Sequence, residues 1–339
     1  MKQVKVHGPG DVRLDEVPEP RPGPRDAVLR VSACGICGTD LRYVRLGGLA
    51  GPSPRPMPLG HELSGVIEEV GSEVRQLAPG TRVVLNPTAG GNQVGNGGPE
   101  GGFAPRLLVR GVADGGRLFP LPEGLPPELG ALAEPLGVGM NAVDRLAPGK
   151  EEKLAVFGAG PIGLAAIASL RDRGVEDVVA VDLSPRRLEI ARRLGARASI
   201  DASREDPWRR LRQLHGEALL LGAPMAATDA YLEASGAASV IPAIVQHARA
   251  GARLCVVALH DGEIPLRFLL VMMKQLTLLG AMEYPEDYGR TLELLCRWDL
   301  SPMISHHLPL ERFHEALTLA RDPSSGGKVL VQMSEGQRP

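Results

Sequence analysis

Residues 154–170 limit the possible folds more than any other part of the chain. They read LAVFGAGPIGLAAIASL, an apolar strand-like run followed by three glycines and then a helical pattern. The glycines Gly158, Gly160 and Gly163 have the spacing G-x-G-x-x-G, and Pro161 suits the first position of a helix. The spacing is a weak signal by itself. A strand before it and a helix after it predict the phosphate-binding turn of a doubly wound sheet.

Each glycine has a separate physical role in such a turn. Gly158 permits the tight turn, Gly160 lets the backbone approach a pyrophosphate, and Gly163 lets the helix pack against the sheet. The next strand, DVVAVD, ends at Asp182, nineteen residues past Gly163, where an acid would hold the adenosine ribose hydroxyls and repel a 2′-phosphate. Arg187 could stack on adenine or simply begin a solvated helix. We therefore predict NAD rather than NADP, bound through Gly158, Gly160, Pro161, Ile162, Gly163, Asp182 and Arg187.

The organisation of the chain indicates two domains. Residues 1 to about 125 combine Gly- and Pro-rich loops with short β-branched runs, a pattern typical of a barrel-like β domain. From about residue 153 to 280, apolar strands alternate with helical stretches, which predicts a parallel sheet. Further helices are expected at residues 285–298 and 310–320. The fold class is therefore α/β.

The totals exclude several classes of protein. The 339 residues have a formal net charge of −2, which gives no electrostatic reason to expect nucleic acid or an anionic membrane as a partner. The sequence contains no run of eighteen apolar residues and no signal-peptide core at its start. Four cysteines do not suggest a disulfide framework, so a cytoplasmic location is expected.

Cysteine and histidine positions in the first domain suggest a metal site. Cys34 and Cys37 form a CxxC pair, but the two remaining cysteines, Cys255 and Cys296, are isolated. A closed four-thiolate zinc site is therefore improbable. An open site is more plausible, with Cys37 and His61 joined by a carboxylate. The acids considered are Glu62, beside the histidine, and Glu134, which lies in an apolar run where a charge needs a partner or else begins a helix.

Motifs throughout the chain resemble the zinc-containing branch of the medium-chain dehydrogenase/reductase family, the alcohol and polyol dehydrogenases. The motifs are GICGTD, GHELSGVIEEVGSEV, PGTRV, GGFA, EPLGVGMNAV, GAGPIG, LEIARRLGA, EASG and GKVLV, all in family order. The resemblance implies a GroES-like β-barrel catalytic domain over residues 1–134 and 282–339, and a Rossmann NAD-binding domain over 135–281. It also implies a homodimer or homotetramer, with the strand at residues 276–281 at the sheet edge.

The resemblance assigns roles to the site residues. It implies that Cys37 and His61 bind the catalytic zinc, with Glu62 and Glu134 sharing or exchanging the remaining positions. Thr39 would accept the alcohol proton, while Asp40 would support the zinc site or cap a helix. Pocket candidates on the same basis are Tyr43, Phe103 and Tyr284, each of which also has a plain packing interpretation.

Three features depart from the family pattern. Residues 86–102, NPTAGGNQVGNGGPEGG, lie where relatives usually carry a cysteine-rich lobe around a structural zinc, so one catalytic zinc per chain and no structural zinc is expected. We interpret this glycine-rich segment as an unstructured linker rather than a cover over the pocket mouth. Arg42 replaces a relay histidine, and Glu283 lies near where polyol dehydrogenases tend to carry an arginine.

The sequence thus predicts a zinc-dependent oxidoreductase that transfers hydride between NAD and a secondary alcohol, polyol or cyclic alcohol, giving a ketone. Its partner is a small-molecule alcohol or ketone, with neither nucleic acid nor membrane. Two alternatives come from other classes: a zinc-free reductase of the same superfamily acting on quinones or enones, and a non-catalytic NAD-binding module. A metal assay and a screen for NAD reduction would distinguish them.

Overall fold

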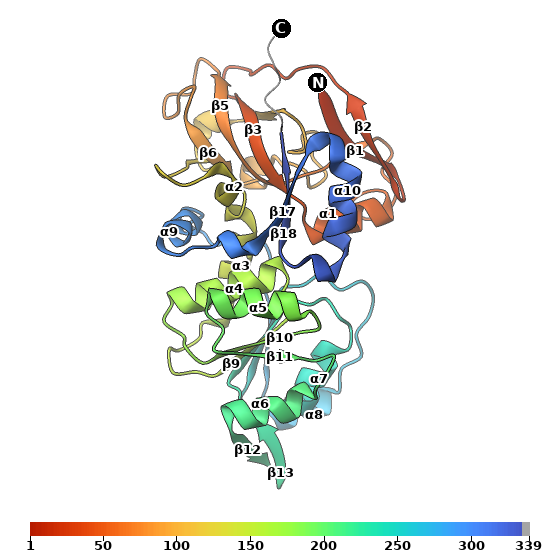
Figure 1. Ribbon diagram of the computed structural model, residues 1–339, viewed down its shortest axis with the longest axis vertical. Coiled ribbons are helices and arrows are strands. Elements are labelled where there is room, and N and C mark those ends of the chain that lie inside the picture. Colours follow the sequence, from red (N-terminus) through yellow and green to blue (C-terminus); the bar gives the residue numbers. More distant parts are fainter. Residues whose placement is uncertain (334–339) are drawn as a thin grey trace. The chain divides into compact units, whose positions relative to one another are not determined.

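The computed structural model describes residues 1–333, which form two compact units (Figure 1). One unit contains Met1–Glu134 and residues 289–333, and the other is Pro135–Tyr288. The domain boundaries after residues 134 and 281 stay a prediction; the compact units divide after Glu134 and Tyr288. Residues 281 and 282 are tied to the second unit, because Ala281 N–H donates to the Val256 carbonyl at 3.0 Å and Asn141 Nδ2 donates to the Met282 carbonyl at 2.8 Å.

The first unit is built mainly from antiparallel strands. One sheet has the order β2-β1-β4, and the other has the order β17-β18-β3-β5-β6-β8, with β7 also pairing with β3. The strands are β1 (Lys2–Gly8), β2 (Asp11–Glu16), β3 (Ala27–Gly35), β4 (Met57–Pro58), β5 (Glu62–Val70), β6 (Arg82–Leu85), β7 (Arg106–Val109), β8 (Leu118–Pro120), β17 (Ile304–Pro309) and β18 (Lys328–Gln332).

The helices of this unit are short. They are α1 (Gly38–Leu46), α2 (Pro127–Gly130), α9 (Arg290–Arg297) and α10 (Phe313–Arg321), together with 3₁₀ turns at Ala89–Gly91, Val112–Asp114, Ser301–Met303, Leu310–Arg312 and Pro323–Ser325. Helix α9 begins five residues later than predicted, and α10 begins after a 3₁₀ turn.

Strand β3 is the centre of the first unit, and it explains where the candidate ligands meet. Its side chains are buried on both faces over most of its length, as expected for a strand flanked by neighbours within a core. Its last residue, Gly35, lies opposite Glu62 of β5 and opposite Leu330 of β18. The sheet therefore brings the residues after β3, the start of β5 and the start of β18 to one place.

The second unit is a doubly wound parallel sheet with the order β11-β10-β9-β14-β15-β16. Figure 1 shows helices on both of its faces, with α4 and α5 on one and α7 on the other. The strands are β9 (Leu154–Phe157), β10 (Val178–Asp182), β11 (Ala198–Asp201), β14 (Ala230–Glu233), β15 (Arg253–Val256) and β16 (Thr277–Gly280). The helices are α4 (Pro161–Asp172), α5 (Pro185–Leu194), α6 (Pro207–His215), α7 (Val240–His247) and α8 (Phe268–Met273), and α3 (Ala133–Leu146) begins at the boundary.

A hairpin that the sequence did not indicate extends from this unit. Strands β12 (Glu217–Leu220) and β13 (Ala223–Ala226) pair antiparallel after α6. The turn includes Leu221 and Gly222, both with positive φ angles of 49° and 81°. Within residues 1–333, no helix combines the length and the apolar character needed to span a bilayer.

The glycine-rich segment, residues 86–102, is not the unstructured linker that we expected. The Asn86 side chain accepts hydrogen bonds from the backbone N–H groups of Thr88 and Ala89, each at 3.3 Å. Val94 is fully buried, and its N–H donates to the Pro87 carbonyl at 3.0 Å. The prediction was wrong because glycine content was read as flexibility alone, whereas glycine also allows two backbones to approach closely.

Candidate active site

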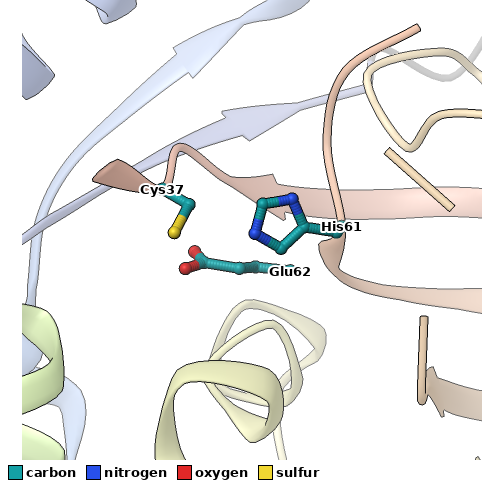
Figure 2. Close-up of side chains that lie close together, drawn as sticks. All are labelled: Cys37, His61 and Glu62. Carbon is teal, nitrogen blue, oxygen red and sulfur yellow. The ribbon is translucent and has the colours of Figure 1, made fainter. Parts of the chain in front are cut away.

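Three unlike side chains meet at the end of β3. The Cys37 thiol, the His61 imidazole and the Glu62 carboxylate each offer one atom, and these atoms lie within 4.8 Å of one another. Figure 2 shows the three groups pointing toward a common point. Cys37 precedes α1, while His61 and Glu62 lie at the start of β5. His61 and Glu62 are buried, at 2% and 0% exposure.

Asp40 connects the two segments that carry the cysteine and the histidine. It is fully buried in the first turn of α1, and its Oδ2 accepts a hydrogen bond from Cys37 N–H at 2.8 Å. Its Oδ1 accepts from Gly60 N–H at 3.3 Å and lies 3.7 Å from His61 Nδ1. Asp40 therefore caps α1 from inside its first turn, by accepting from the N–H of the N-cap residue Cys37, and it faces the ring of the candidate metal-binding histidine.

A buried lysine, which sequence reasoning missed, faces the glutamate. Lys328 Nζ at the start of β18 lies 2.6 Å from the Glu62 carboxylate and donates to the Ile36 carbonyl at 3.1 Å. Both members of the pair are buried, at 2% and 0% exposure. Burial disfavours the charged lysine, but Glu62 and the neighbouring acids outweigh this, so the pKa of Lys328 is raised. Its signal in the sequence was a lone charge in the apolar run GKVLV.

The surroundings of His61 favour a positive charge. Burial acts to lower the pKa of His61, but Asp40, Cys37 and Glu134 outweigh it and raise the pKa well above its usual value. Burial has the opposite effect on an acid, and it raises the pKa of Asp40. An excess of acids around an imidazole attracts either a proton or a metal cation.

The donor set matches a zinc site with an open position. Thiolate, imidazole and carboxylate are the protein ligands that zinc takes, and three such ligands leave the fourth position for substrate or water. In the described chain, His61 Nδ1 is buried without a hydrogen bond, and it faces the carboxylate of Asp40. The residues present therefore fit zinc.

Two sequence candidates lie outside this cluster. Among the described residues, Glu134 is not one of the three that approach within 4.8 Å, although it is buried and its charge acts on both His61 and Lys328. Cys34, the first cysteine of the CxxC pair, is a fully buried core residue whose thiol donates to the Gly35 carbonyl at 3.8 Å. The structure thus groups Glu62, rather than Glu134, with Cys37 and His61.

The glycine fingerprint forms an open turn between β9 and α4. A β-carbon at Gly158, whose φ is +94°, would lie 2.6 Å from Ser235 N, and one at Gly163 would lie 1.8 Å from the Gly158 carbonyl oxygen. At Gly160, by contrast, a β-carbon would have one described neighbour outside the adjacent residues, Arg187 Nη1 at 4.0 Å. Gly160 therefore leaves space over the N-terminus of α4, as pyrophosphate binding requires.

Asp182 supports this turn as well as ending β10. One carboxylate oxygen accepts from Ala159 N–H at 2.6 Å, and the other accepts from Ser184 N–H at 2.8 Å. Each carboxylate oxygen can accept a further hydrogen bond, so the carboxylate still has capacity for ribose hydroxyls. Arg187 extends toward Gly160, which suits a phosphate group as well as the adenine ring that the sequence suggested.

Comparison with known protein families agrees with this geometry. Residues 23–122 match the family model described as "Alcohol dehydrogenase GroES-like domain", and residues 161–297 match "Zinc-binding dehydrogenase". A sorbitol dehydrogenase of Homo sapiens is 33% identical over 330 residues, which cover 92% of this chain and 90% of that protein. The chain belongs to the zinc-containing medium-chain dehydrogenase/reductase family.

Solved structures place the dehydrogenase in the alcohol and polyol branch. A 2R,3R-butanediol dehydrogenase from Bacillus subtilis is 29% identical with a TM-score of 0.85, covering 98% of this chain and 99% of that one. A galactitol-1-phosphate dehydrogenase from Escherichia coli is also 29% identical, with a TM-score of 0.79 and coverage of 98% and 100%. The predicted family, the GroES-like and Rossmann fold class and the enzyme class are confirmed.

Three further residues that the sequence singled out lie outside the group of candidate ligand atoms. Thr39 lies half-buried in the first turn of α1, two residues after Cys37. Arg42 Nη1 donates to the Leu49 carbonyl at 2.9 Å, outside the cluster of ligand atoms. Phe103 is fully buried and packs edge-on against Phe313 at a centroid distance of 4.9 Å, which favours the packing interpretation.

Two tyrosines complete the candidates. Tyr43 is buried, and its hydroxyl donates to Asn96 Oδ1 at 3.4 Å. Tyr284 lies edge-on to Tyr288 at 5.3 Å in the other unit. Glu283 has a positive φ of 65° and is exposed, so this position presents an acid on an unusual backbone conformation.

Proposed function

We propose that this dehydrogenase oxidises a secondary alcohol group of a polyol or cyclic alcohol to a ketone, with NAD as hydride acceptor. The observation that carries the proposal is the convergence of Cys37, His61 and Glu62 within 4.8 Å. Similar proteins are named for sorbitol, 2R,3R-butanediol and galactitol 1-phosphate, each a molecule with two or more hydroxyl groups. A zinc-free reductase would have no use for this donor set.

Cys37, His61 and Glu62 would hold one zinc, with no structural zinc elsewhere in the chain. When bound, zinc supplies a Lewis acid that lowers the pKa of the substrate alcohol. Asp40 orients His61 and keeps the Cys37 backbone in place. Lys328 balances the negative charge of Glu62 within the buried site.

The remaining polar groups suggest a route for the proton. Thr39 follows Cys37 by two residues, and its hydroxyl can accept the alcohol proton and donate its own onward. Glu134 is a buried acid whose charge acts on His61 and Lys328, so we propose it as the acid that exchanges with Glu62. Arg42 remains charged near neutral pH and cannot replace a relay histidine.

The dinucleotide turn supports NAD as the cofactor. Gly160 provides room for the pyrophosphate at the start of α4, together with Pro161 and Ile162. The carboxylate of Asp182 would hold the ribose hydroxyls and repel the 2′-phosphate of NADP. We propose NAD as the preferred cofactor on this basis.

We also propose that the chain self-associates. In the described part of the chain, β16 pairs with β15 on one side and has no strand on the other. Large apolar side chains are exposed near it, namely Phe268, Leu269, Met272, Met273, Leu278 and Met282. An edge strand with an apolar surface needs a cover, and the same strand of a second copy would provide one. Sedimentation showing a monomer at all concentrations would contradict this.

The test is NADH formation over a panel of secondary alcohols, diols, cyclitols and sugar alcohols, measured by absorbance. We expect at least one to be oxidised by the purified zinc-loaded protein. Cys34→Ala is a matched control for Cys37→Ser, because Cys34 belongs to the same CxxC pair but lies in the core. Activity lost in Cys37→Ser and kept in Cys34→Ala supports the proposal. Reduction of quinones or enones by metal-free protein would overturn it.

A further inference from the structure

We propose that the glycine-rich segment positions the metal centre, because its backbone lies in close contact with Gly60, the residue before His61. The inference rests on the proposed zinc site. It assigns a role to residues 95–103, which belong neither to the ligand set nor to the dinucleotide turn.

The contact between the two backbones is close. A β-carbon at Gly95 would lie 2.2 Å from the Gly60 carbonyl oxygen and 2.4 Å from its carbonyl carbon. Gly102 N–H donates to that carbonyl at 2.8 Å, and Phe103 N–H donates to the Leu59 carbonyl at 3.2 Å. Leu59 and Asn96 form a further β-bridge. Residues 95–103 therefore hold both residues that precede His61.

The restraint on Gly60 extends to both candidate ligand segments. Gly60 N–H donates to Asp40 Oδ1 at 3.3 Å, and Asp40 Oδ2 accepts from Cys37 N–H at 2.8 Å. A continuous chain of hydrogen bonds thus runs from Gly102 through Gly60 and Asp40 to Cys37. Displacing Gly60 would change the position of His61 directly and that of Cys37 through Asp40.

A second contact reaches α1 itself. The Tyr43 hydroxyl donates to Asn96 Oδ1 at 3.4 Å, and Tyr43 lies six residues after Cys37 in the sequence. The segment therefore touches the helix that follows one candidate ligand as well as the backbone that precedes the other. Two attachment points fix a separation, whereas one would leave it free.

This geometry explains why the segment is rich in glycine. A β-carbon at Gly101 would lie 2.5 Å from the Leu59 carbonyl oxygen and 2.9 Å from the Leu59 nitrogen. Real β-carbons do not approach backbone atoms that closely, so a side chain at Gly101 would push the segment away from Leu59. At Gly102 the nearest atom would be the end of the Leu63 side chain, at 2.4 Å. The glycines are required for contact between backbones rather than for flexibility.

The test compares two glycines in the same conformation. Gly95 and Gly91 have φ angles of +64° and +77°, so alanine is strained at both, but a β-carbon at Gly91 would have no described atom within 4 Å beyond its chain neighbours. Zinc affinity is measured by competition with a chromophoric chelator, and ligand geometry by the absorption spectrum of the Co²⁺-substituted protein.

We expect Gly95→Ala to weaken zinc binding by about 10- to 100-fold, as removal of groups that orient ligands does, and to shift the Co²⁺ spectrum. Gly91→Ala should change the affinity by no more than about threefold. Equal affinities and spectra in the two variants would overturn the inference.

A measurement on the unaltered chain decides the question if Gly95→Ala does not fold. We expect the amides of Gly102 and Phe103 to remain protected from hydrogen exchange after zinc is removed, because the segment orders the site and not the reverse. Loss of that protection on zinc removal would overturn the inference. If the unaltered chain binds no zinc, the proposed function itself is overturned. That result differs from a chain that binds zinc and loses amide protection without it, so the two failures can be distinguished.

Discussion

The molecule contains two glycine-rich segments that use the same residue in opposite ways. In the turn at residues 158–163, Gly160 leaves open space at the start of α4. In residues 95–102, the space beside Gly95, Gly98, Gly101 and Gly102 is filled by the protein's own atoms. The first segment is shaped to receive a ligand, and the second is closed on its own chain.

Glycine content by itself therefore does not reveal the role of a segment. What distinguishes the two segments is what a β-carbon would touch: solvent and ligand space at Gly160, but the Gly60 backbone at Gly95. Even the open turn has closed positions, because Gly158 and Gly163 approach their neighbours too closely for a side chain. The following four tests address this difference.

The largest expected effect concerns the zinc content, which should depend on Cys37 and not on the glycine-rich segment. The sequence of residues 86–104 contains no cysteine or histidine, so we expect about one zinc per chain, all of it at the Cys37 site. Cys37→Ser should remove the zinc and lower kcat/KM by about 1,000-fold or more, since a metal Lewis acid contributes several kcal/mol. Elemental analysis measures this. Two tightly bound zincs, or one retained in Cys37→Ser, would mean that the closed segment or another region also binds metal.

Alanine substitutions in the two glycine-rich segments should have different effects on stability. Gly98→Ala should lower the free energy of unfolding by about 2 kcal/mol through overpacking, because its β-carbon would lie 2.4 Å from the Asn92 carbonyl oxygen. Gly160→Ala should change that free energy by less than about 0.5 kcal/mol.

The order should reverse for cofactor binding. NADH fluorescence titration should show an affinity loss of about tenfold in Gly160→Ala, where the methyl group occupies the pyrophosphate approach, and none in Gly98→Ala. Urea denaturation supplies the stability values. If both variants lose stability and keep NADH affinity, the turn at residues 158–163 is closed in the same way as the other segment.

Asp182 tests whether the open turn selects its cofactor. Asp182→Asn keeps the size of the side chain and an oxygen acceptor for Ala159 N–H or Ser184 N–H, but removes the charge. We expect NAD affinity to fall by up to about tenfold while NADP affinity falls less, because the repulsion of the 2′-phosphate is lost. Dissociation constants for NADH and NADPH measure the ratio. An unchanged ratio would contradict the role given to Asp182.

The smallest effect concerns the stability of the unit that carries the open turn. His215 is fully buried between Thr228, at 2.7 Å, and Asp177, at 3.3 Å, and burial lowers its pKa to about 4. A base with a lower pKa in the folded state binds fewer protons when folded than when unfolded. The contribution of neutral His215 to the free energy of unfolding is therefore fully present above about pH 6.5 and is lost as the pH falls toward 4.

His215→Gln should therefore reduce the loss of unfolding free energy between pH 7 and pH 5 by on the order of 1 kcal/mol. Urea denaturation at the two pH values measures this. If the variant loses as much unfolding free energy between pH 7 and pH 5 as the parent, groups other than His215 cause the acid response. The pH dependence would then not distinguish the stability of the two units.

Local signals were sufficient for the dinucleotide turn and for part of the metal site. Gly158, Gly160, Gly163 and Asp182 lie within one strand-turn-helix-strand unit, so their spacing in sequence determines their arrangement. Cys37 and His61 were also named correctly as close neighbours, because the motifs containing them were recognised as a set.

Long-range pairing determined what the sequence did not show. The choice between Glu62 and Glu134 depends on the register that places Gly35 opposite Glu62, and Lys328 reaches the site through the pairing of β18 with β3. The hairpin β12–β13 was missed because each strand has only four residues, and their sequences, EALL and APMA, show no alternation of polar and apolar residues. No single window of residues contains this information.

The pair of Glu62 and Lys328 has a consequence for the order of events during synthesis. Its members are 266 positions apart, and the whole second unit is translated between them. Because domains fold as the chain emerges, we expect the dinucleotide unit to be complete while the buried Glu62 still lacks its counter-charge. The candidate metal centre can form only after β18 pairs with β3. A ribosome-bound chain halted before Lys328 should therefore have a folded dinucleotide unit and an incompletely folded first unit.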